Sequence, residues 1–226
     1  MKKRVALSWS GGKDSAMAYH TLAAQEDLLI EFLITTYNES NNRSSMHGVR
    51  LDLIEMQAEK LGARLLKIPL PPNCSNETYS ERMKTALQTL ASEGINDVAF
   101  GDIFLEDVRR YREENLASVN FRGIFPLWGR DTKELAHEFL RLGFKAIICC
   151  VDIQQAPSWL IGREYSWELL ENLPREVDPC GERGEFHTFV YDGPIFKEPI
   201  RIEKGEMVLR EGRFLFLDLI SRYDKC

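Results

Sequence analysis

A junction between a predicted strand and a predicted helix near the N-terminus carries the residue types that hold a polyphosphate. The apolar run from Val5 ends in Ser-Gly-Gly, and Lys-Asp-Ser follows at once. Glycines let the backbone turn tightly beside a ligand, and the first N–H groups of a helix attract anions. Serine hydroxyls and a lysine ammonium add donors. The predicted phosphate-binding residues are Ser8, Ser10, Gly11, Gly12, Lys13, Asp14 and Ser15.

The same junction has a simpler explanation. Serine and glycine often occur between a strand and a helix only to form the turn and cap the helix. Asp14 could help to hold Mg²⁺, or it could be a first-turn acid that the helix dipole stabilises. The spacing matches neither the common phosphate loop nor the dinucleotide-binding fingerprint, so any polyphosphate site here belongs to another class.

A second cluster of reactive residue types lies between Asp178 and Pro194, where Glu182, Glu185 and His187 occur among several glycines. Carboxylates at this spacing could bind an amine or a metal, and a histidine could transfer a proton. A glycine-rich turn with solvated charges, leading into an edge strand, explains the same composition equally well.

The elements that must position these residues alternate between strand and helix over the first two-thirds of the chain. This order is typical of a parallel sheet wrapped by helices. We predict an α/β fold with a doubly wound, mostly parallel sheet whose strand carboxyl ends share one edge with the Ser-Gly-Gly loop. The predicted strands are Val5–Ser8, Leu29–Thr36, Arg64–Ile68, Val98–Gly101, Gly123–Leu127 and Ala146–Val151. The predicted helices are Asp14–Ala24, Gly48–Leu61, Thr78–Ser92 and Asp131–Leu142.

The pattern changes after Val151, where prolines and glycines become frequent. A short helix is predicted at about Glu164–Asn172, then a strand at Phe186–Tyr191. A hairpin follows, formed by Glu206–Arg210 and Phe214–Ile220. We therefore predict a nucleotide-binding domain of residues 1–155 and a small C-terminal α+β domain of residues 156–226.

Composition excludes some classes of function. The formal net charge of −6 argues against a broad nucleic-acid-binding surface. No apolar run approaches the length of a bilayer span, and Met1–Arg4 leads straight into the first strand instead of forming a signal peptide. We expect a cytoplasmic protein without membrane contact, and a homodimer is compatible with the sequence.

Two motifs resemble those of known families. Ser-Gly-Gly-Lys-Asp-Ser resembles the pyrophosphate loop of the N-type ATP pyrophosphatases, the adenine nucleotide alpha hydrolase group, which leave AMP on an acceptor. From Gly181, the order Gly-Glu-x-Gly-Glu-Phe-His-Thr, followed by Tyr-Asp-Gly-Pro-Ile-Phe, resembles the diphthine–ammonia ligase family. Further matches extend the resemblance over most of the chain; they are Gly101-Asp102-Ile103, Arg109, Arg112-Glu113-Glu114, Pro126-Leu127-Trp128 and Gly143-Phe144-Lys145-Ala146.

The resemblance implies a Rossmann-like nucleotide-binding domain with a smaller acceptor-binding domain. It also implies that ATP, with Mg²⁺, adenylates the carboxylate of diphthine on elongation factor 2, and that ammonia then displaces AMP. Adenine would lie near Thr35, Thr36 and Tyr37, with Met46 and His47 closing the pocket, although ordinary strand-end and loop residues explain these types equally well. Gly101 is also predicted to bind ATP. Catalysis would involve Lys13, Glu182, Glu185 and His187. Acceptor binding would involve Asp102, Arg109, Gly181, Glu182, Glu185, His187 and Thr188.

Two segments depart from the family pattern. Asp102 is an acid where the family has a small residue, and Ser44-Ser45-Met46-His47 only partly matches the family's Ser-Tyr-Met-Phe-His. Both lie near the expected pocket, so another carboxylate acceptor is an alternative. A non-catalytic ATP sensor is a second alternative. A tRNA-thiolating pyrophosphatase is a third, which the lack of any Cys-x-x-Cys pair disfavours.

Overall fold

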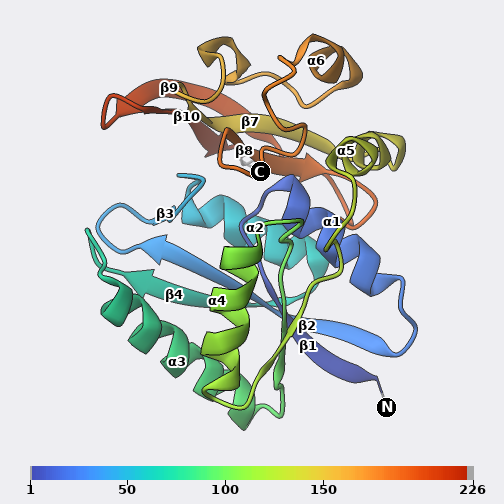
Figure 1. Ribbon diagram of the computed structural model, residues 1–226, viewed down its shortest axis with the longest axis vertical. Helices are drawn as coiled ribbons and strands as arrows, with labels where there is room; N and C mark the ends of the chain where they lie inside the picture. The colour runs from blue at the N-terminus through green and yellow to red at the C-terminus, as the bar shows by residue number, and fades with distance from the viewer. Residues whose placement is uncertain (1, 223–226) are drawn as a thin grey trace.

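A mostly parallel sheet of six strands forms the centre of the first part of the chain in this computed structural model, which describes residues 2–222 (Figure 1). Five strands follow the order β4-β2-β1-β5-β6 with parallel neighbours, and the short β3 pairs antiparallel with the end of β2. These strands are β1 (Lys3–Ser8), β2 (Leu28–Asn38), β3 (Arg43–Ser44), β4 (Arg64–Leu70), β5 (Asp97–Ala99) and β6 (Arg122–Ile124).

Helices cover both faces of this sheet, as predicted. Side chains alternate along a strand, so Val5 and Leu7 of β1 join one apolar cluster and Ala6 joins the other. Helices α1 (Lys13–Ala23) and α2 (Leu51–Leu61) pack on the first side, and α3 (Asn76–Ser92) and α4 (Glu106–Ala117) on the second. Helix α4 was not predicted from the sequence: Leu116 is its only buried side chain, so it carries no apolar stripe at helical spacing.

A second sheet is antiparallel and follows the order β8-β7-β10-β9. Its strands are β7 (Lys145–Asp152), β8 (Phe186–Asp192), β9 (Ile202–Arg210) and β10 (Phe214–Ser221). The predicted hairpin around Gly212 is present as β9 and β10. Helix α5 (Thr132–Arg141) precedes β7, and a 3₁₀ turn, η1 (Ser158–Leu160), and α6 (Trp167–Asn172) follow it.

The prediction that Ala146–Val151 belongs to the parallel sheet is wrong. These residues form most of β7, which lies between β8 and β10 in the antiparallel sheet. A continuous apolar run shows that a strand is buried on both faces, but the direction of its neighbours does not follow from it. The chain therefore passes from the first sheet to the second between Ile124 and Lys145. The predicted domain boundary at residue 155 stays a prediction.

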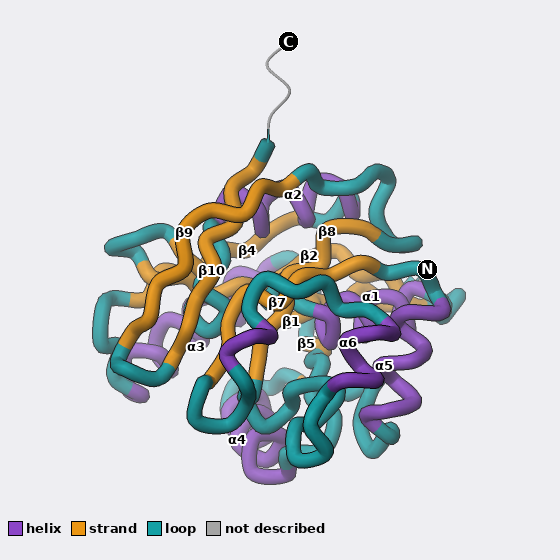
Figure 2. The backbone as a smooth tube through the Cα atoms, turned by 90° about the horizontal axis from the view of Figure 1, so that it is seen from above, coloured by secondary structure: helices purple, strands orange, loops and turns teal. Residues whose placement is uncertain are grey.

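Helices α1 and α2 lie between the two sheets and pack against both (Figure 1). One apolar cluster joins Leu7 of β1, Leu53 of α2 and Phe189 of β8. Seen from above, the strands of the second sheet lie over this helical layer (Figure 2). The loop between β1 and α1 is thereby brought against the edge strand β8. Within residues 2–222, no helix combines the length and apolar character that crossing a membrane requires.

Candidate active site at the edge of the parallel sheet

The loop between β1 and α1 has a backbone that requires glycine. Gly11 has φ of +81°, and a Cβ atom there would lie 2.6 Å from Ile54 Cδ1. The helix start is fixed by Ser15, whose hydroxyl donates to the Gly12 carbonyl at 2.8 Å. The Ser10 hydroxyl accepts a 3.3 Å hydrogen bond from the Gly12 N–H. The predicted turn before a helix N-terminus is therefore present.

The free edge of β8 is hydrogen-bonded to this loop. The Val190 N–H donates to the Gly11 carbonyl at 2.9 Å, and the Lys13 N–H donates to the Thr188 hydroxyl at 3.0 Å. The two segments are far apart in the chain, so the geometry of the loop depends on the second sheet. Thr188, predicted to bind the acceptor, is buried and instead holds the start of α1.

Gln57 on α2 connects both segments and was missed in the sequence. Its side chain is fully buried; it accepts from Trp9 Nε1 at 2.8 Å and donates to Gly11 O at 3.0 Å and Val190 O at 2.7 Å. A buried polar group is stable only when it is hydrogen-bonded. One sequence signal could have identified Gln57: it is a glutamine beside the apolar stripe of α2. In the folded chain that stripe lies next to the loop that contains Trp9.

A cavity of about 790 Å³, here called the switch-point cavity, opens at the carboxyl ends of β1 and β5. The connections that leave these neighbours run in opposite directions along the sheet, which is where ligands bind in open α/β sheets. Its wall contains most of the predicted residues: Ser8, Ser10, Asp14, Ser15, Thr35, Thr36, Met46, His47, Gly101, Asp102, Gly181, Glu182 and His187. Residues from both halves of the chain therefore meet in one cavity.

The remaining predicted residues do not line this cavity. They are Gly11, Gly12, Lys13, Tyr37, Arg109, Glu185 and Thr188. Gly11 and Gly12 still form the loop beneath it, whereas Tyr37 lies at the end of β2 beside β3. The sequence alone could not distinguish residues whose side chains line the cavity from residues that only support its wall.

Lys13 does not line the cavity. Its ammonium binds the Cys180 carbonyl and lies 2.9 Å from an Asp14 carboxylate oxygen, with only 4% of the residue exposed. Burial penalises the charge of this group, but Asp14, Cys180 and Glu182 together outweigh that penalty and raise the pKa of Lys13. Lys13 therefore connects α1 to the loop that begins at Cys180.

Glu185 holds that loop from behind. One carboxylate oxygen accepts from the Asp178 N–H at 3.0 Å and the other from the Arg183 N–H at 2.9 Å. The residue is 2% exposed, so both oxygens are occupied and shielded. Glu185 therefore fixes the conformation of this loop, and its side chain does not line the cavity.

Glu182 faces the cavity and has the properties of a general base. One of its oxygens accepts from the Ile103 N–H at 2.8 Å. Burial raises the pKa of Glu182 to about 7, since a charged carboxylate is poorly solvated there. A group with a pKa near 7 exchanges protons readily at neutral pH.

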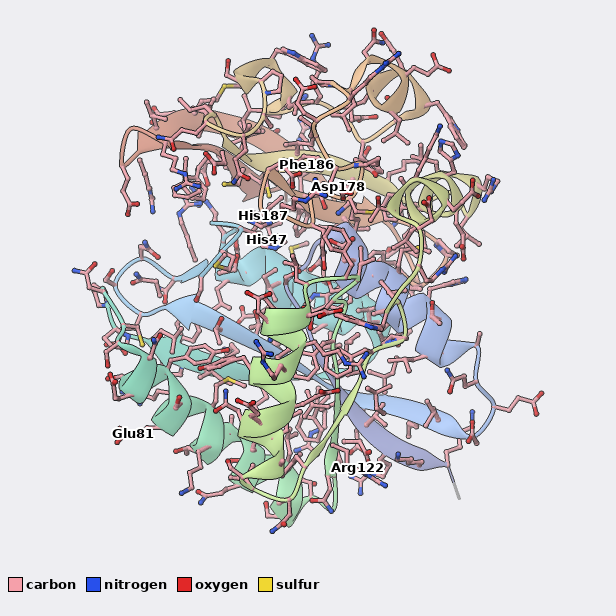
Figure 3. The ribbon with its side chains drawn as sticks, viewed as in Figure 1. His47, Glu81, Arg122, Asp178, Phe186 and His187 are labelled. Carbon is pink, nitrogen blue, oxygen red and sulfur yellow. The ribbon has the colours of Figure 1, made fainter. Side chains whose placement is uncertain are left out.

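His47 and His187 stack on each other in the wall, with ring centroids 4.4 Å apart. Figure 3 shows them side by side between the second sheet and the parallel sheet, near Phe186. His47 Nδ1 lies 3.1 Å from the Thr188 carbonyl oxygen, which can only accept, so Nδ1 carries the proton. Burial lowers the pKa of His47 to about 4 and lowers the pKa of His187 well below its usual value, so both rings are neutral at pH 7.

The end of β5 approaches the start of α1 closely. A Cβ atom on Gly101 would lie 2.9 Å from the Asp14 carbonyl carbon, so only glycine fits this contact. Next to it, Asp102 forms an ion pair with Arg112 of α4, with 2.7 Å between Oδ2 and Nε. Arg112 lines the cavity, whereas the predicted Arg109 pairs with Glu113 and stacks on Trp128 outside it.

The site offers few ligands for a metal. Within residues 2–222, no group of three or more histidine, cysteine or acidic side chains is arranged to hold an ion. Asp14 is the acid at the start of α1 that reaches the cavity, and its side chain is 30% exposed. Mg²⁺ often needs only one or two carboxylates because substrate phosphates supply its other ligands. Asp14 fits that limited role.

Fold and cavity together define a Rossmann-like α/β protein with a ligand site where a glycine-rich loop, a helix N-terminus and a second sheet meet. Comparison with known protein families finds a match to each of the two parts of the chain. Residues 2–119 match the diphthamide synthase N-terminal domain and residues 131–223 the diphthamide synthase C-terminal domain. The chain belongs to the diphthamide synthase family, as the sequence motifs predicted.

Several curated relatives carry the name diphthine–ammonia ligase. The protein from Mus musculus is 27% identical over 92% of this chain and 86% of its own length. The Homo sapiens protein is 24% identical over the same shares. The Danio rerio protein is 33% identical over 51% of this chain and 47% of its own length.

Proposed function

We propose that this chain is an ATP-dependent ligase that adenylates a carboxylate and transfers ammonia to it, with diphthine on elongation factor 2 as the acceptor. The acceptor is carried over from the relatives named diphthine–ammonia ligase. The main structural support is that the Ser10–Ser15 loop, the end of β5 and the Gly181–His187 segment meet at the switch-point cavity.

ATP would lie with its phosphates over the Ser10–Ser15 loop and the start of α1, where backbone N–H groups and the helix dipole favour anions. Its adenine would lie against Thr35 and Thr36 at the end of β2, beneath Met46 and His47. Mg²⁺ would be held by the phosphates and Asp14, and when bound it neutralises charge on the departing pyrophosphate.

The reaction would proceed in two balanced steps. A carboxylate oxygen attacks the α-phosphate, and the bond to the β-phosphate breaks, which gives an acyl-adenylate and pyrophosphate. Ammonia then attacks the acyl carbon and AMP leaves with the oxygen of the acceptor, which gives the amide. The protein contributes by holding the reacting groups in line and by stabilising negative charge as it develops.

Glu182 is the proposed proton acceptor for the attacking nitrogen, because it faces the cavity with a pKa near 7. Neutral His187 would accept a hydrogen bond from ammonia beside it. Lys13 and Glu185 would act by positioning the loop that carries Glu182, and Lys13 also contributes positive charge beneath the phosphates. Asp102 and Arg112 would line the part of the cavity that binds the acceptor. Arg112 takes the place of the predicted Arg109, which does not line the cavity.

The test combines MgATP, an ammonium salt and elongation factor 2 that carries diphthine. We expect AMP and pyrophosphate in equal amounts and conversion of the acceptor carboxylate to an amide. Glu182→Gln is expected to abolish the amide, whereas the exposed Glu176→Gln in the same half of the chain serves as the matched control. Formation of ADP and phosphate, or of AMP without any amide, would contradict the proposal.

Two further predictions from the sequence remain open. A cytoplasmic location would be checked by imaging the tagged full chain. A homodimer would be checked by sedimentation, and the edge strand β9 is a suitable contact because Met207, Val208 and Leu209 are all exposed.

A further inference from the structure

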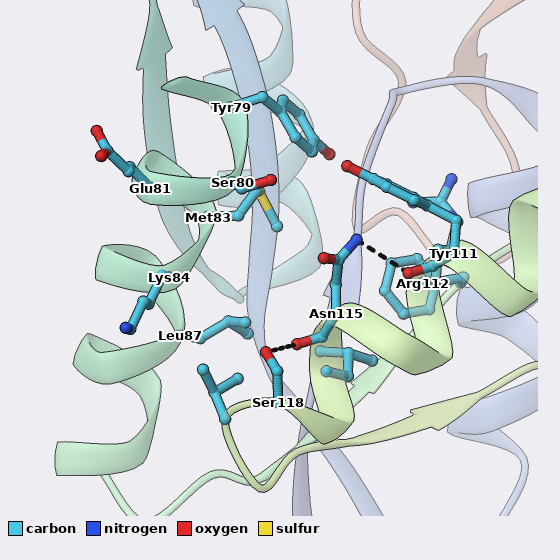
Figure 4. A pocket seen from close by; sticks show the side chains of 13 residues that line it. Tyr79, Ser80, Glu81, Met83, Lys84, Leu87, Tyr111, Arg112, Asn115 and Ser118 are labelled. Carbon is cyan, nitrogen blue, oxygen red and sulfur yellow. Dashed lines mark hydrogen bonds between the residues drawn. The ribbon is translucent and has the colours of Figure 1, made fainter. Parts of the chain in front are cut away.

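The switch-point cavity takes its wall from helices and from irregular segments. Helices α3 and α4 contribute Tyr79 and Tyr111, whose hydroxyl groups are directed toward each other (Figure 4). Residues 45–49, which connect β3 to α2 and are here called the wall loop, contribute Ser45, Met46 and His47. A loop has no helix or sheet ladder of its own, so its conformation depends on contacts with its surroundings.

Asp218 of β10 binds an arginine near each end of the wall loop. Arg43 lies in β3 and Arg50 precedes α2, and their backbones form a β-bridge with each other. The Asp218 carboxylate accepts hydrogen bonds from Arg43 Nη2 at 2.7 Å and from Arg50 Nε and Nη2 at 2.9 and 2.7 Å. Arg43 Nη1 also donates to the Gly48 carbonyl inside the loop at 2.9 Å. The three side chains of Arg43, Arg50 and Asp218 are here called the arginine clamp.

The wall loop lies against the second sheet at two more points. Gly48 has φ of +66°, and a Cβ atom there would lie 2.6 Å from Phe216 Cδ1, so only glycine fits beside β10. His47 Nδ1 donates to the Thr188 carbonyl of β8 at 3.1 Å. The place of Met46 and His47 in the cavity wall is therefore set by strands that are distant in the sequence.

The arginine clamp has the properties of a strong contact. The side chains of Asp218 and Arg43 are 17% and 22% exposed, so water and salt screen their charges only in part. A carboxylate that accepts from arginine on both oxygens is held by charge-assisted hydrogen bonds, which are roughly twice as strong as neutral ones. The hydrogen bonds from Arg50 and Arg43 lower the pKa of Asp218, so this carboxylate is ionised at neutral pH.

We propose that Asp218 is a positioning residue for ATP binding, because the arginine clamp holds Met46 and His47 in the wall of the cavity. This inference rests on the proposed function, which takes ATP as the occupant of the cavity. Asp218 does not itself line the cavity, so it acts on the nucleotide through the wall loop. Met46 is 67% exposed and presents apolar surface that a bound base would cover. If the loop is in place in only a fraction of the molecules, the apparent Kd of ATP rises by the inverse of that fraction.

Asp218→Asn keeps the size of the side chain and removes its charge. We expect the Kd of a non-hydrolysable ATP analogue with Mg²⁺, measured by calorimetric titration of the full chain, to rise about tenfold, which is the effect of losing one charge-assisted hydrogen bond. At saturating ATP, kcat should stay within about twofold of the parental value, because the clamp acts on binding and not on the chemical step. A parental Kd, or a large fall in kcat at saturating ATP, would overturn the proposal. If this variant folds poorly, Arg43→Gln opens the clamp from the other side and should raise the Kd likewise.

Asp97→Asn is the matched control. Asp97 also binds two cations, Lys3 at 2.9 Å and Arg122 at 3.1 Å, but it begins β5 at the amino end of the sheet and does not line the cavity. This variant should lose stability without a change in the Kd of the ATP analogue. Asp218→Glu, which keeps the charge, should bind the analogue more tightly than Asp218→Asn does. An equal rise in Kd for Asp97→Asn and Asp218→Asn would reduce the effect to a general loss of stability and would overturn the proposal.

Hydrogen exchange of the wall loop needs no nucleotide, so it separates this inference from the function on which it rests. The Gly48 N–H donates to Ser44 O at 3.1 Å and should exchange about tenfold faster in Asp218→Asn, but at the parental rate in Asp97→Asn. If the parent binds the ATP analogue and forms the amide but Asp218→Asn keeps the parental Kd, only the assignment of Asp218 fails. If exchange changes as expected but the parent binds no ATP analogue, the clamp holds the loop and the ligase proposal fails.

Discussion

Replacement of Gln57 by leucine tests whether the phosphate loop depends on its contact with the second sheet. The substitution preserves approximate size but removes all three hydrogen bonds of the side chain. Gly11 O keeps its bond from the Val190 N–H, so it remains satisfied. The Trp9 indole N–H and the Val190 carbonyl lose the partners that Gln57 provides.

The cost follows from these two orphaned groups. Each buried polar group that loses its partner costs about 1–3 kcal/mol, and the apolar leucine offsets roughly 1 kcal/mol. We therefore expect the free energy of unfolding to fall by about 1–5 kcal/mol. Because the same bonds hold Gly11, the Kd of ATP is expected to rise as well.

Urea unfolding measures the first quantity and calorimetric titration with MgATP the second. Gln88→Leu, an exposed glutamine on α3, is the matched control and should change neither. A Gln57→Leu variant with parental stability and parental ATP affinity would refute the idea that the edge of β8 organises the loop.

Three further substitutions test separate parts of the site. Glu182 must be deprotonated to accept a proton and its pKa is about 7, so turnover at a fixed concentration of uncharged ammonia should fall as pH drops below about 7; Glu182→Gln should lower kcat by about 100-fold or more and remove this dependence. An unchanged pH profile in that variant would exclude Glu182 as the base. Gly101→Ala should destabilise the protein by about 1–3 kcal/mol, because its Cβ would lie 2.9 Å from Asp14; an unchanged melting temperature would contradict this contact. Glu185→Gln places an amide N–H₂ against the backbone N–H of Asp178 or Arg183 and should cost about 1–3 kcal/mol, whereas loss of amide formation at full stability would restore Glu185 as a catalytic group.

Local features were predictable from the sequence because they depend on neighbours along the chain. The Gly11 turn, the serine next to it and the helix that starts at Lys13 occupy consecutive positions, so their types and order specify the loop. The order of strands and helices likewise indicated a doubly wound sheet. Motifs from both halves identified the family, which the comparisons confirmed.

The directions of individual side chains were not predictable. Lys13 and Glu185 belong to the right motifs, but tertiary contacts engage them with the Cys180 carbonyl and with backbone N–H groups, so neither lines the cavity. Arg109 and Arg112 are one turn apart on α4, and a choice between them required the orientation of a helix that the sequence did not reveal. The register of β8 against the loop, and with it the role of Gln57, depends on pairing between distant segments.

The claim on which the mechanism depends is that AMP leaves with an oxygen atom of the acceptor carboxylate. Labelling that carboxylate with ¹⁸O and analysing the nucleotide product by mass spectrometry tests it directly. The proposed chemistry predicts that one ¹⁸O atom appears in AMP and none in pyrophosphate. Unlabelled AMP, or label in inorganic phosphate together with ADP, would contradict an acyl-adenylate.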